Sequence, residues 1–362
     1  MGNTATVLVS NIALPSSAIG SWTTRITRLM NSRPDVFTHI LSPSNTSENQ
    51  YSKKRKFLTW YKPLRSIQLK NWVARDYLRS IKRIAKNHEK LIIVVMDDPH
   101  LVEAVTLYKH AFSAEIELIF SFHGYNLTLT PKTLSKIDKI LWLSETAIKK
   151  SQLSYEATLP NSIVVGNAVD SDVFFPLSED ALIKLRSDHG YVAEDDILIW
   201  MANDRPKKGF HIFESIVKQL VSEYHNLKVI TIGTTKKIDH PSVNNVGRIP
   251  NNVVAAYLQL GDYYMFTTLY EEGFGLSMIE AYKCGNIVLA SNLGAIPEVL
   301  LELPGTYVIE SPEDVEAWVD AYKMAQQSIR NGKQRITRQE ASDVWNYKNW
   351  EQRFINAIAP ND

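Results

Sequence analysis

Residues 270–285, YEEGFGLSMIEAYKCG, bring two carboxylates together with a glycine turn and a short apolar run. Glu272 and Glu280 stand eight residues apart, with Gly273 and Gly275 between them. The apolar run before this stretch is typical of a strand, and the residues after the glycines are typical of a helix. The glycines therefore mark a strand-to-helix junction, at which the backbone can approach a ligand closely.

A helix that begins near Leu276 and Ser277 would offer a binding site for phosphate. Its first backbone amides have no partner inside the helix, and they lie at the positive end of the helix dipole. Glu280 falls about one turn into the helix, too far along to be a simple cap, and Glu272 precedes the turn. One carboxylate on each side of a phosphate suits hydrogen bonds to the hydroxyls of a ribose and of a sugar. The spacing leaves a second interpretation open, in which both glutamates are solvated beside a structural turn.

The elements that would position these residues form a regular alternation. Short apolar runs alternate with amphipathic helical patterns, which predicts parallel sheets covered by helices on both faces. The alternation restarts after residue ~175, so we predict an α/β fold with two doubly wound, Rossmann-like domains and a cleft between them. The predicted strands lie within residues 4–14, 91–98, 116–124, 139–145, 162–169, 196–204, 227–233, 263–269 and 286–292.

Charge is divided unevenly along the chain of 362 residues. Residues 1–165 hold 22 Lys and Arg against 12 Asp and Glu, whereas residues 166–362 hold 18 against 27. This asymmetry suggests two domains that face different partners. The single cysteine, Cys284, excludes an internal disulfide, and no apolar run reaches the about 18 residues that cross a bilayer. The N-terminus has no basic segment typical of a signal peptide, so we expect a cytoplasmic protein.

Several familiar catalytic signatures are absent from the sequence. We find no Walker A loop, no HExxH, no paired CxxC and no GxGxxG. Asp170-Ser171-Asp172 formally matches the Asp-x-Asp of metal-dependent nucleotide-sugar enzymes, but its sequence context favours a turn. No metal is therefore expected.

Residues 271–285 resemble the Glu-x7-Glu signature of retaining glycosyltransferases of family 4, which have the glycosyltransferase-B (GT-B) fold. Other stretches resemble the family in the correct order: VVGNAVDSDVFFP, RPKKGFHIF, VGRIPNNVVAAYLQLGDYYMFTTL and SNLGAIPEVL, with FHGY and LSETAIKK in the first half. The resemblance is strong over residues 160–310 and patchy over residues 1–160.

The resemblance implies a role for each matching residue. Glu280 would hold the ribose hydroxyls of a nucleotide, and Glu272 a hydroxyl of the donor sugar. Arg205 and Lys208 would neutralise the departing diphosphate, which needs cations where charge develops. The implied catalytic residues are His123, Glu272, Arg205 and Lys208. The implied donor-binding residues are Gly20, Arg205, Lys208, Glu272, Gly273, Phe274, Gly275, Leu276, Ser277 and Glu280.

Two of these roles concern the N-terminal half, and one has a competing interpretation. His123 would line the cleft near the reacting centre, although a structural loop histidine is the alternative. Gly20, in the first strand-helix loop, would lie beside the donor phosphate and the acceptor. No metal is implied, because two side-chain cations and a helix N-terminus can neutralise the diphosphate.

The sequence departs from the family pattern at three places. The first loop has Ile19-Gly20 instead of a Gly-Gly pair, and Asn167-Ala168 replaces the interdomain Asn-Gly. Asn203 stands where the family usually has an arginine, five residues before Lys208. The diphosphate role of Arg205 is therefore open, with Lys207 as a substitute.

The resemblance also implies the domain organisation. Residues 1–165 would form an acceptor-binding domain and residues 166–343 a nucleotide-sugar-binding domain. A terminal helix over residues 344–362 would cross back onto the N-terminal domain; the alternative is a helix that packs wholly on the C-terminal domain. Its Trp345, Tyr347, Trp350 and Phe354 are too much apolar surface to leave in water.

A basic amphipathic pattern over residues 64–88 admits two interpretations. One is a surface helix packed on the N-terminal sheet. The other is a surface that docks on an anionic membrane or a lipid-linked acceptor. No nucleic-acid motif accompanies the charge, so nucleic acid is not an expected partner.

Taken with the resemblance, these features predict a retaining glycosyltransferase. It would move a sugar from a nucleotide-sugar, most simply a UDP-sugar, to a hydroxyl of a glycan or glycolipid in polysaccharide or lipopolysaccharide biosynthesis. Two alternatives stay open: a nucleotide-sugar epimerase or hydrolase of the same fold, and a non-catalytic nucleotide-binding partner protein.

Overall fold

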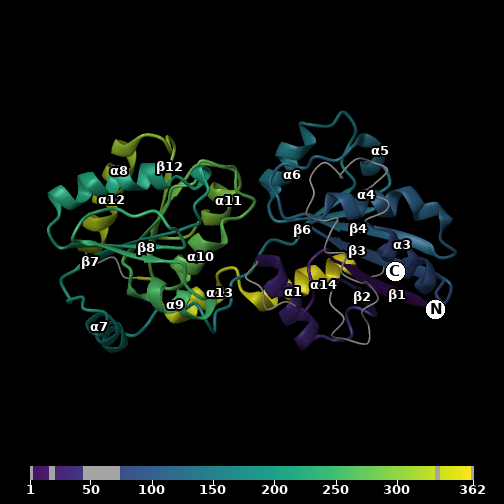
Figure 1. Cartoon of the computed structure of the whole chain (residues 1–362), viewed down its shortest axis with the longest axis horizontal. Coiled ribbons are helices and arrows are strands. Elements are labelled where there is room, and N and C mark those ends of the chain that lie inside the picture. Colours follow the sequence, from purple (N-terminus) through teal and green to yellow (C-terminus); the bar gives the residue numbers. More distant parts are fainter. Residues whose placement is uncertain (1–2, 16–20, 44–73, 331–334, 360–362) are drawn as a thin grey trace. The chain divides into compact units, whose positions relative to one another are not determined.

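The computed structural model describes residues 3–15, 21–43, 74–330 and 335–359 (Figure 1). Its contacts divide the chain into two compact units. Unit 1 comprises Met1–Gly166 and Trp350–Asp362, and unit 2 comprises Asn167–Asn349. The expected boundaries after residues 165 and 343 thus fall after residues 166 and 349.

The core of unit 1 is a parallel sheet with the strand order β2-β1-β3-β4-β5-β6. Its central strands are buried on both faces, as expected for parallel strands covered by helices. The strands are β1 (Thr4–Val9), β2 (His39–Leu41), β3 (Lys90–Met96), β4 (Glu115–Ser121), β5 (Lys139–Trp142) and β6 (Asn161–Val164).

Helices flank this sheet, and the last helix of the chain belongs to unit 1 from Trp350 onward. The described helices are α1 (Ser21–Ser32), α3 (Arg75–Ala85), α4 (Pro99–Tyr108), η2 (Lys109–Ala111), α5 (Pro131–Leu134), α6 (Glu145–Gln152) and α14 (Tyr347–Ile358). The Arg25 guanidinium of α1 lies 5.2 Å from the ring of Trp350 in α14. Near the end of α14, the Ala357 carbonyl accepts a 2.7 Å hydrogen bond from Lys139 Nζ on β5.

Unit 2 holds a second parallel sheet, with the strand order β12-β11-β10-β7-β8-β9. Its strands are β7 (Asp196–Met201), β8 (Leu227–Ile232), β9 (Val243–Gly247), β10 (Tyr263–Phe266), β11 (Ile287–Ser291) and β12 (Thr306–Ile309). The sheet begins in its middle, at β7, and grows first toward β9 and then toward β12. This is the strand order of a doubly wound fold, so the predicted fold class is confirmed for both units.

Helices of unit 2 lie on both faces of its sheet (Figure 1). They are α7 (Glu179–Asp188), η3 (Pro206–Lys208), α8 (Phe210–Glu223), α9 (Asn251–Leu260), α10 (Leu276–Lys283), α11 (Ile296–Leu300), α12 (Val315–Arg330) and α13 (Arg338–Asp343). On the face covered by α8 and α12, a core cluster includes Trp200, Phe213 and Trp318, each at most 1% exposed.

Each of the nine predicted strands is present, and the described residues contain three further strands that were not predicted. Strands β2, β9 and β12 form outer edges of the two sheets. The terminal helix begins at Tyr347 rather than at residue 344. The reason is Trp345, whose positive φ of 42° is incompatible with a continuous right-handed helix.

Candidate functional site

The residues of the Glu-x7-Glu stretch lie at the switch point of the unit 2 sheet. Strands β7 and β10 are hydrogen-bonded neighbours, and the chain order reverses between them. Ligands of doubly wound sheets bind at the carboxyl ends of the strands beside such a point. Lys208 follows β7 and Glu272 follows β10, so the topology brings together two residues that are 64 positions apart.

The turn that carries Lys208 is fixed against the loop after β10. The backbone of Leu269 donates a 2.7 Å hydrogen bond to the Lys207 carbonyl. The Thr267 hydroxyl donates to the carbonyls of Lys208 and Gly209, at 3.3 and 3.1 Å. Gly209 has a φ of 72°, and a Cβ there would lie 1.7 Å from the Thr267 carbonyl oxygen. Only glycine can occupy position 209, because any side chain would collide with this backbone. The close packing places the neighbouring Lys208 at the candidate site.

Lys208 and Glu272 form a half-buried ion pair. Lys208 Nζ lies 2.5 Å from Glu272 Oε1, and the Thr268 hydroxyl donates to the same oxygen at 3.1 Å. Among the described residues, Glu272 Oε2 has no hydrogen-bond partner. The pair therefore holds one cation in place while one carboxylate oxygen stays able to accept a hydrogen bond.

The glycine turn ends at the N-terminus of α10, as predicted. Gly275 is the residue before the helix, with a φ of 80°, and no side chain caps the helix there. Gly273 lies outside the left-handed region. The Ser277 hydroxyl accepts a 3.0 Å hydrogen bond from Tyr264 of β10, so it is already engaged by the protein. The leading amides of α10, at Leu276 and Ser277, have no acceptor within the helix, and their positive end suits a phosphate.

Glu280 lies one turn into α10, in an environment that disfavours its ionised form. Its carboxylate is half-buried, and no described side chain donates a hydrogen bond to it. Burial raises the pKa of Glu280 to about 7. The site therefore contains an acceptor that is only partly ionised at neutral pH before a ligand binds.

This raised pKa predicts a pH-dependent stability. The pKa of about 7 exceeds the ordinary 4.5, so the native state binds more protons than the unfolded state between these values. The free energy of unfolding therefore falls as the pH rises through this window. Glu280→Gln, which cannot ionise, is expected to melt about 2–6 °C above wild type at pH 8 and at the same temperature at pH 4.5. Scanning calorimetry of the ligand-free proteins measures this, and an equal difference at both pH values would contradict it.

The other predicted cations are placed differently from Lys208. Arg205 is exposed, and its guanidinium has no ion-pair or hydrogen-bond partner among the described residues. Lys207 Nζ lies 3.3 Å from the centroid of the Tyr270 ring. The backbone N–H of Arg205 donates to Asn203 Oδ1 at 3.1 Å, so Asn203 stabilises the turn instead of supplying a charge.

Asp204, which the sequence did not single out, ties three loops of this edge together. Its carboxylate accepts hydrogen bonds from the Thr234 hydroxyl at 2.6 Å, the Thr235 N–H at 2.7 Å and Arg248 Nη2 at 3.1 Å. These donors hold the pKa of Asp204 well below its usual range. The loops after β7, β8 and β9 are thereby joined at a carboxylate that stays ionised.

His123 belongs to unit 1, two residues after the end of β4. Its Nε2 lies 3.1 Å from the Ser121 hydroxyl, and its Nδ1 is buried without a hydrogen-bond partner among the described residues. Burial, together with the charge of Arg25, lowers the pKa of His123 well below its ordinary value, so the ring is neutral at pH 7. The other predicted residue of this half, Gly20, lies outside the described residues.

Asp97, at the end of β3, is a candidate that the sequence interpretation missed. Its Oδ1 accepts a 3.0 Å hydrogen bond from the His123 N–H. Burial raises the pKa of Asp97 to about 6, and its φ of 45° is unusual for a residue with a side chain. The available signal was an acidic residue directly after a buried strand. Asp97 and His123 together mark the carboxyl edge of the unit 1 sheet beside its own switch point, between β1 and β3.

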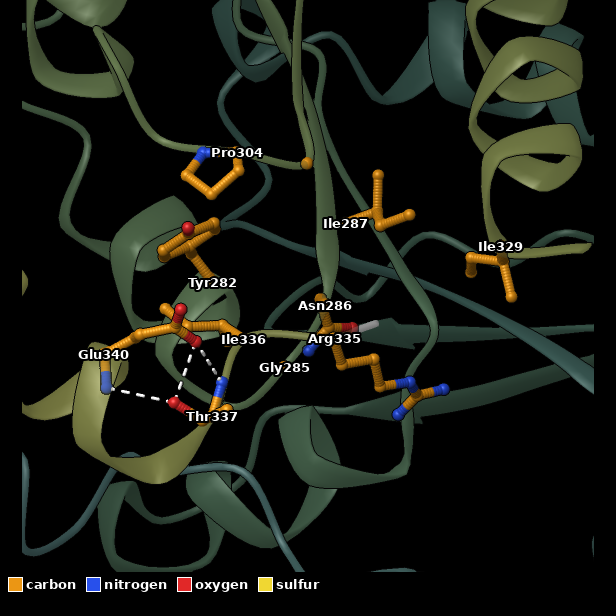
Figure 2. A pocket seen from close by; sticks show the side chains of 11 residues that line it. Tyr282, Gly285, Asn286, Ile287, Pro304, Ile329, Arg335, Ile336, Thr337 and Glu340 are labelled. Carbon is orange, nitrogen blue, oxygen red and sulfur yellow. Dashed lines mark hydrogen bonds between the residues drawn. The ribbon is translucent and has the colours of Figure 1, made fainter. Parts of the chain in front are cut away.

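A cavity of about 140 Å³ lies elsewhere in unit 2, at the C-terminal end of α10 (Figure 2). Its charged side chains are already satisfied. Arg335 is paired with Asp262, and the Glu340 carboxylate accepts hydrogen bonds from the Thr337 N–H and hydroxyl, each 2.8 Å long. The lining includes Tyr282 and Gly285 from the end of the Glu-x7-Glu stretch, but it includes none of Lys208, Glu272 and Glu280.

Among the described residues, no group of three or more His, Cys, Asp or Glu is arranged to hold a metal ion. Asp170 Oδ1 accepts a 3.0 Å hydrogen bond from the Asp172 N–H, which is the turn that the sequence favoured for this pair. No described helix is both long and apolar enough to cross a membrane.

Comparisons with known proteins agree with this geometry. Residues 195–327 match the protein family described as Glycosyl transferases group 1. The chain is 24% identical over 244 residues to a phosphatidyl-myo-inositol mannosyltransferase of Propionibacterium freudenreichii, and the match covers 66% of this chain and 59% of that protein. It is 26% identical over 213 residues to the phosphatidylinositol N-acetylglucosaminyltransferase GPI3 subunit of Saccharomyces cerevisiae, and the match covers 53% of this chain and 46% of that protein. The chain thus spans about half of the length of these curated relatives.

A solved structure resembles nearly the whole chain. Anabaena HepE, determined in complex with UDP, aligns with a TM-score of 0.68 at 13% identity, over 97% of this chain and 98% of that one. At this identity the match shows the fold alone. The chain thus has the GT-B fold, with two doubly wound units and the Glu-x7-Glu turn at the switch point of the second, and its residues 195–327 match the Glycosyl transferases group 1 family.

Proposed function

We propose that this protein is a retaining glycosyltransferase that moves a sugar from a UDP-sugar to a hydroxyl of a glycan or glycolipid acceptor. One observation carries the proposal: the Lys208–Glu272 ion pair lies at the switch point of unit 2, beside the uncapped N-terminus of α10. A nucleotide-sugar needs cations for its diphosphate, acceptors for its sugar and ribose hydroxyls, and N–H groups for its phosphate oxygens. This one edge supplies all three.

In this assignment each group has a defined task. Lys208 and the leading amides of α10 stabilise the negative charge that develops on the departing diphosphate. Glu272 aims Lys208 through Oε1 and accepts a donor-sugar hydroxyl at Oε2. Glu280 accepts the ribose hydroxyls. Retention follows from front-side displacement through an oxocarbenium-like state. The bond from the anomeric carbon to the diphosphate breaks, the acceptor oxygen bonds to that carbon on the same face, and the acceptor hydroxyl proton passes to the departing diphosphate.

The relatives support the class of donor and acceptor. Two curated relatives are named as enzymes that glycosylate phosphatidylinositol, which favours a glycolipid acceptor. HepE, a neighbour in fold, was determined with UDP, which favours a UDP-sugar. The polysaccharide or lipopolysaccharide setting is a further part of the proposal, and it rests on the family resemblance alone.

A nucleotide screen followed by product analysis tests the function. Differential scanning fluorimetry with UDP, GDP, ADP and their sugars should show selective stabilisation by one base, because a bound ligand raises apparent stability. The selected nucleotide-sugar is then incubated with and without a phosphatidylinositol acceptor. Sugar transfer only with acceptor supports the proposal. Free sugar or an isomerised donor in the absence of acceptor would support a hydrolase or epimerase, and binding without turnover a non-catalytic partner.

The proposed reaction needs no metal ion. Lys208 and the α10 N-terminus already supply positive charge at the diphosphate, so EDTA is expected to leave the turnover of wild type within about twofold. Turnover is measured by release of the nucleoside diphosphate, with and without chelator. Loss of activity with EDTA and its recovery with Mn²⁺ would contradict a metal-independent reaction.

We also propose that the enzyme is cytoplasmic and makes peripheral contact with the inner face of a membrane. The exposed side of α3 and its C-cap residue carries five cations, which are Arg75, Arg79, Lys82, Arg83 and Lys86. The one acidic residue of the helix, Asp76, is partly exposed and pairs with Arg79 at 3.7 Å. The part of the predicted basic pattern at residues 64–73 lies outside the described residues. Each basic residue near an anionic surface contributes about 1 kcal/mol.

A charge-reversal variant measures this contact. Replacing Lys82, Arg83 and Lys86 with glutamate is expected to weaken binding to vesicles with about 30% phosphatidylserine roughly 100-fold or more, as followed by co-sedimentation. The control variant replaces three exposed lysines on other helices, Lys132, Lys149 and Lys184, with glutamate, so the net charge of the protein changes by the same amount. Equal loss in both variants would show a dependence on net charge without a docking face.

A further inference from the structure

A short segment of unit 2, residues 341–345, contacts both ends of α10; we name it the bracket segment. At the C-terminal end of the helix, the Lys283 side chain is fully buried. Its ammonium donates hydrogen bonds to the carbonyls of Ala341 at 2.5 Å and Val344 at 2.7 Å, and to the Ser171 hydroxyl at 2.9 Å. A buried charge is tolerated only with such partners, so the bracket segment is fixed to this end of α10.

At the other end of α10, the bracket segment reaches the glycine turn of the candidate site. The rings of Trp345 and Phe274 meet edge to face, with centroids 4.9 Å apart and planes inclined by 82°. Phe274 is the middle residue of the Gly-Phe-Gly turn and is only 3% exposed. Trp345 Nε1 donates a 3.1 Å hydrogen bond to the Val299 carbonyl, which fixes the plane of the indole. The conformation of the turn is therefore supported by a ring that lies 71 residues further along the chain.

The backbone of Trp345 is held in an uncommon conformation to allow this contact. Its φ is 42°, in the left-handed region that residues with side chains seldom adopt. Its carbonyl accepts a 2.9 Å hydrogen bond from the Val169 N–H. Such strain persists only where the surroundings determine it, and here the surroundings are the Phe274 ring, the Val299 carbonyl and the Val169 amide.

We propose that Trp345 is a positioning residue for the donor site, which acts by holding the Phe274 turn, and with it Glu272 and the leading amides of α10, in the geometry that binds the donor. For its ligand this inference rests on the function proposed above. Trp345 does not touch the donor in this account. Its effect passes through Phe274, while Lys283 keeps the bracket segment aligned with the helix.

Hydrogen exchange of the ligand-free protein tests the positioning role directly. Trp345→Leu removes the ring, and the amides of residues 272–278 are expected to exchange at least about 10-fold faster, together with the Val169 amide. Trp345→Phe keeps an edge-to-face ring but loses the bond to Val299, and its exchange at the turn should stay within about 3-fold of wild type. Equal exchange at the turn in Trp345→Leu and wild type would overturn the proposal.

A matched control separates positioning from general destabilisation. Tyr224 is also half-buried in unit 2, and its ring meets Tyr322 edge to face at 5.6 Å, so Tyr224→Leu removes a similar contact. This control should leave residues 272–278 unchanged, even at the same loss of melting temperature. Faster exchange at the turn in both variants would mean that Trp345 contributes stability only.

The affinity for UDP gives the functional readout. Calorimetry is expected to show about 10-fold weaker UDP binding in Trp345→Leu, and wild-type affinity within about 3-fold in Trp345→Phe and Tyr224→Leu. Wild-type UDP affinity in Trp345→Leu would overturn the proposal. If the wild-type protein itself binds no UDP, the proposed donor is wrong, and the ligand-free exchange still decides whether Trp345 positions the turn.

Discussion

Replacing Lys208 with alanine is expected to lower turnover about 100- to 1,000-fold, the range found when one preorganised stabiliser of developing charge is removed. In the structure Lys208 is the cation that the fold delivers to Glu272, through a turn bonded to the loop after β10. Charge on the diphosphate grows as the sugar leaves, so the loss should fall on kcat more than on the affinity for free UDP. Steady-state kinetics and calorimetry on the same variant separate these quantities.

Two control variants sharpen this result. Lys207→Ala removes a neighbouring cation that lies over the Tyr270 ring, and it should lower turnover less than about 10-fold. The double variant Lys208→Ala/Glu272→Gln tests whether the unpaired Glu272 causes the loss, because it removes both charges of the pair. Turnover restored in the double variant would assign the effect to the stranded carboxylate. A kcat of Lys208→Ala within about 3-fold of wild type would exclude Lys208 from leaving-group stabilisation.

Glu280→Ala is expected to weaken binding of UDP about 5- to 150-fold, which corresponds to about 1–3 kcal/mol for a lost charged hydrogen bond. The half-buried carboxylate has no described donor of its own, so a pair of ribose hydroxyls would satisfy it. Titration calorimetry measures the affinity, with Glu271→Ala as a control that removes a neighbouring charge. Unchanged UDP affinity in Glu280→Ala would show that Glu280 does not hold the ribose.

The same assignment predicts how UDP affinity depends on pH. The pKa of Glu280 is about 7 in the free protein, and hydroxyl donors favour the ionised form. Affinity should therefore rise as the pH increases through about 7, with release of a proton from Glu280. The nucleotide phosphate also titrates, near pH 6, so the informative quantity is the difference between wild type and Glu280→Gln, in which the protein contribution is absent. Parallel pH profiles for the two proteins would contradict the assignment.

The described residues also show which structural features the sequence patterns could not predict. Strands with long apolar runs, such as β3 and β8, were predicted because buried parallel strands are apolar on both faces. Strands β2, β9 and β12 were missed because they form sheet edges: β2 has three residues, and β9 and β12 are largely half-exposed, so their composition carries little signal. Trp345 was assigned to the terminal helix because aromatic spacing cannot reveal a backbone at positive φ.

By itself, the sequence determined the alternation of strands and helices, the two-domain organisation and the glycine turn between Glu272 and Glu280. These features are local, because they depend on residues that lie within a few turns or one strand of one another. The tertiary structure alone decided that Lys208 pairs with Glu272, that Asp97 lies beside His123 and that Trp345 supports Phe274. Each of these contacts joins residues 26 to 71 positions apart. The first exists because β7 and β10 become neighbours in a sheet, and the second because β3 and β4 do. The third exists because the chain returns to the glycine turn at Trp345.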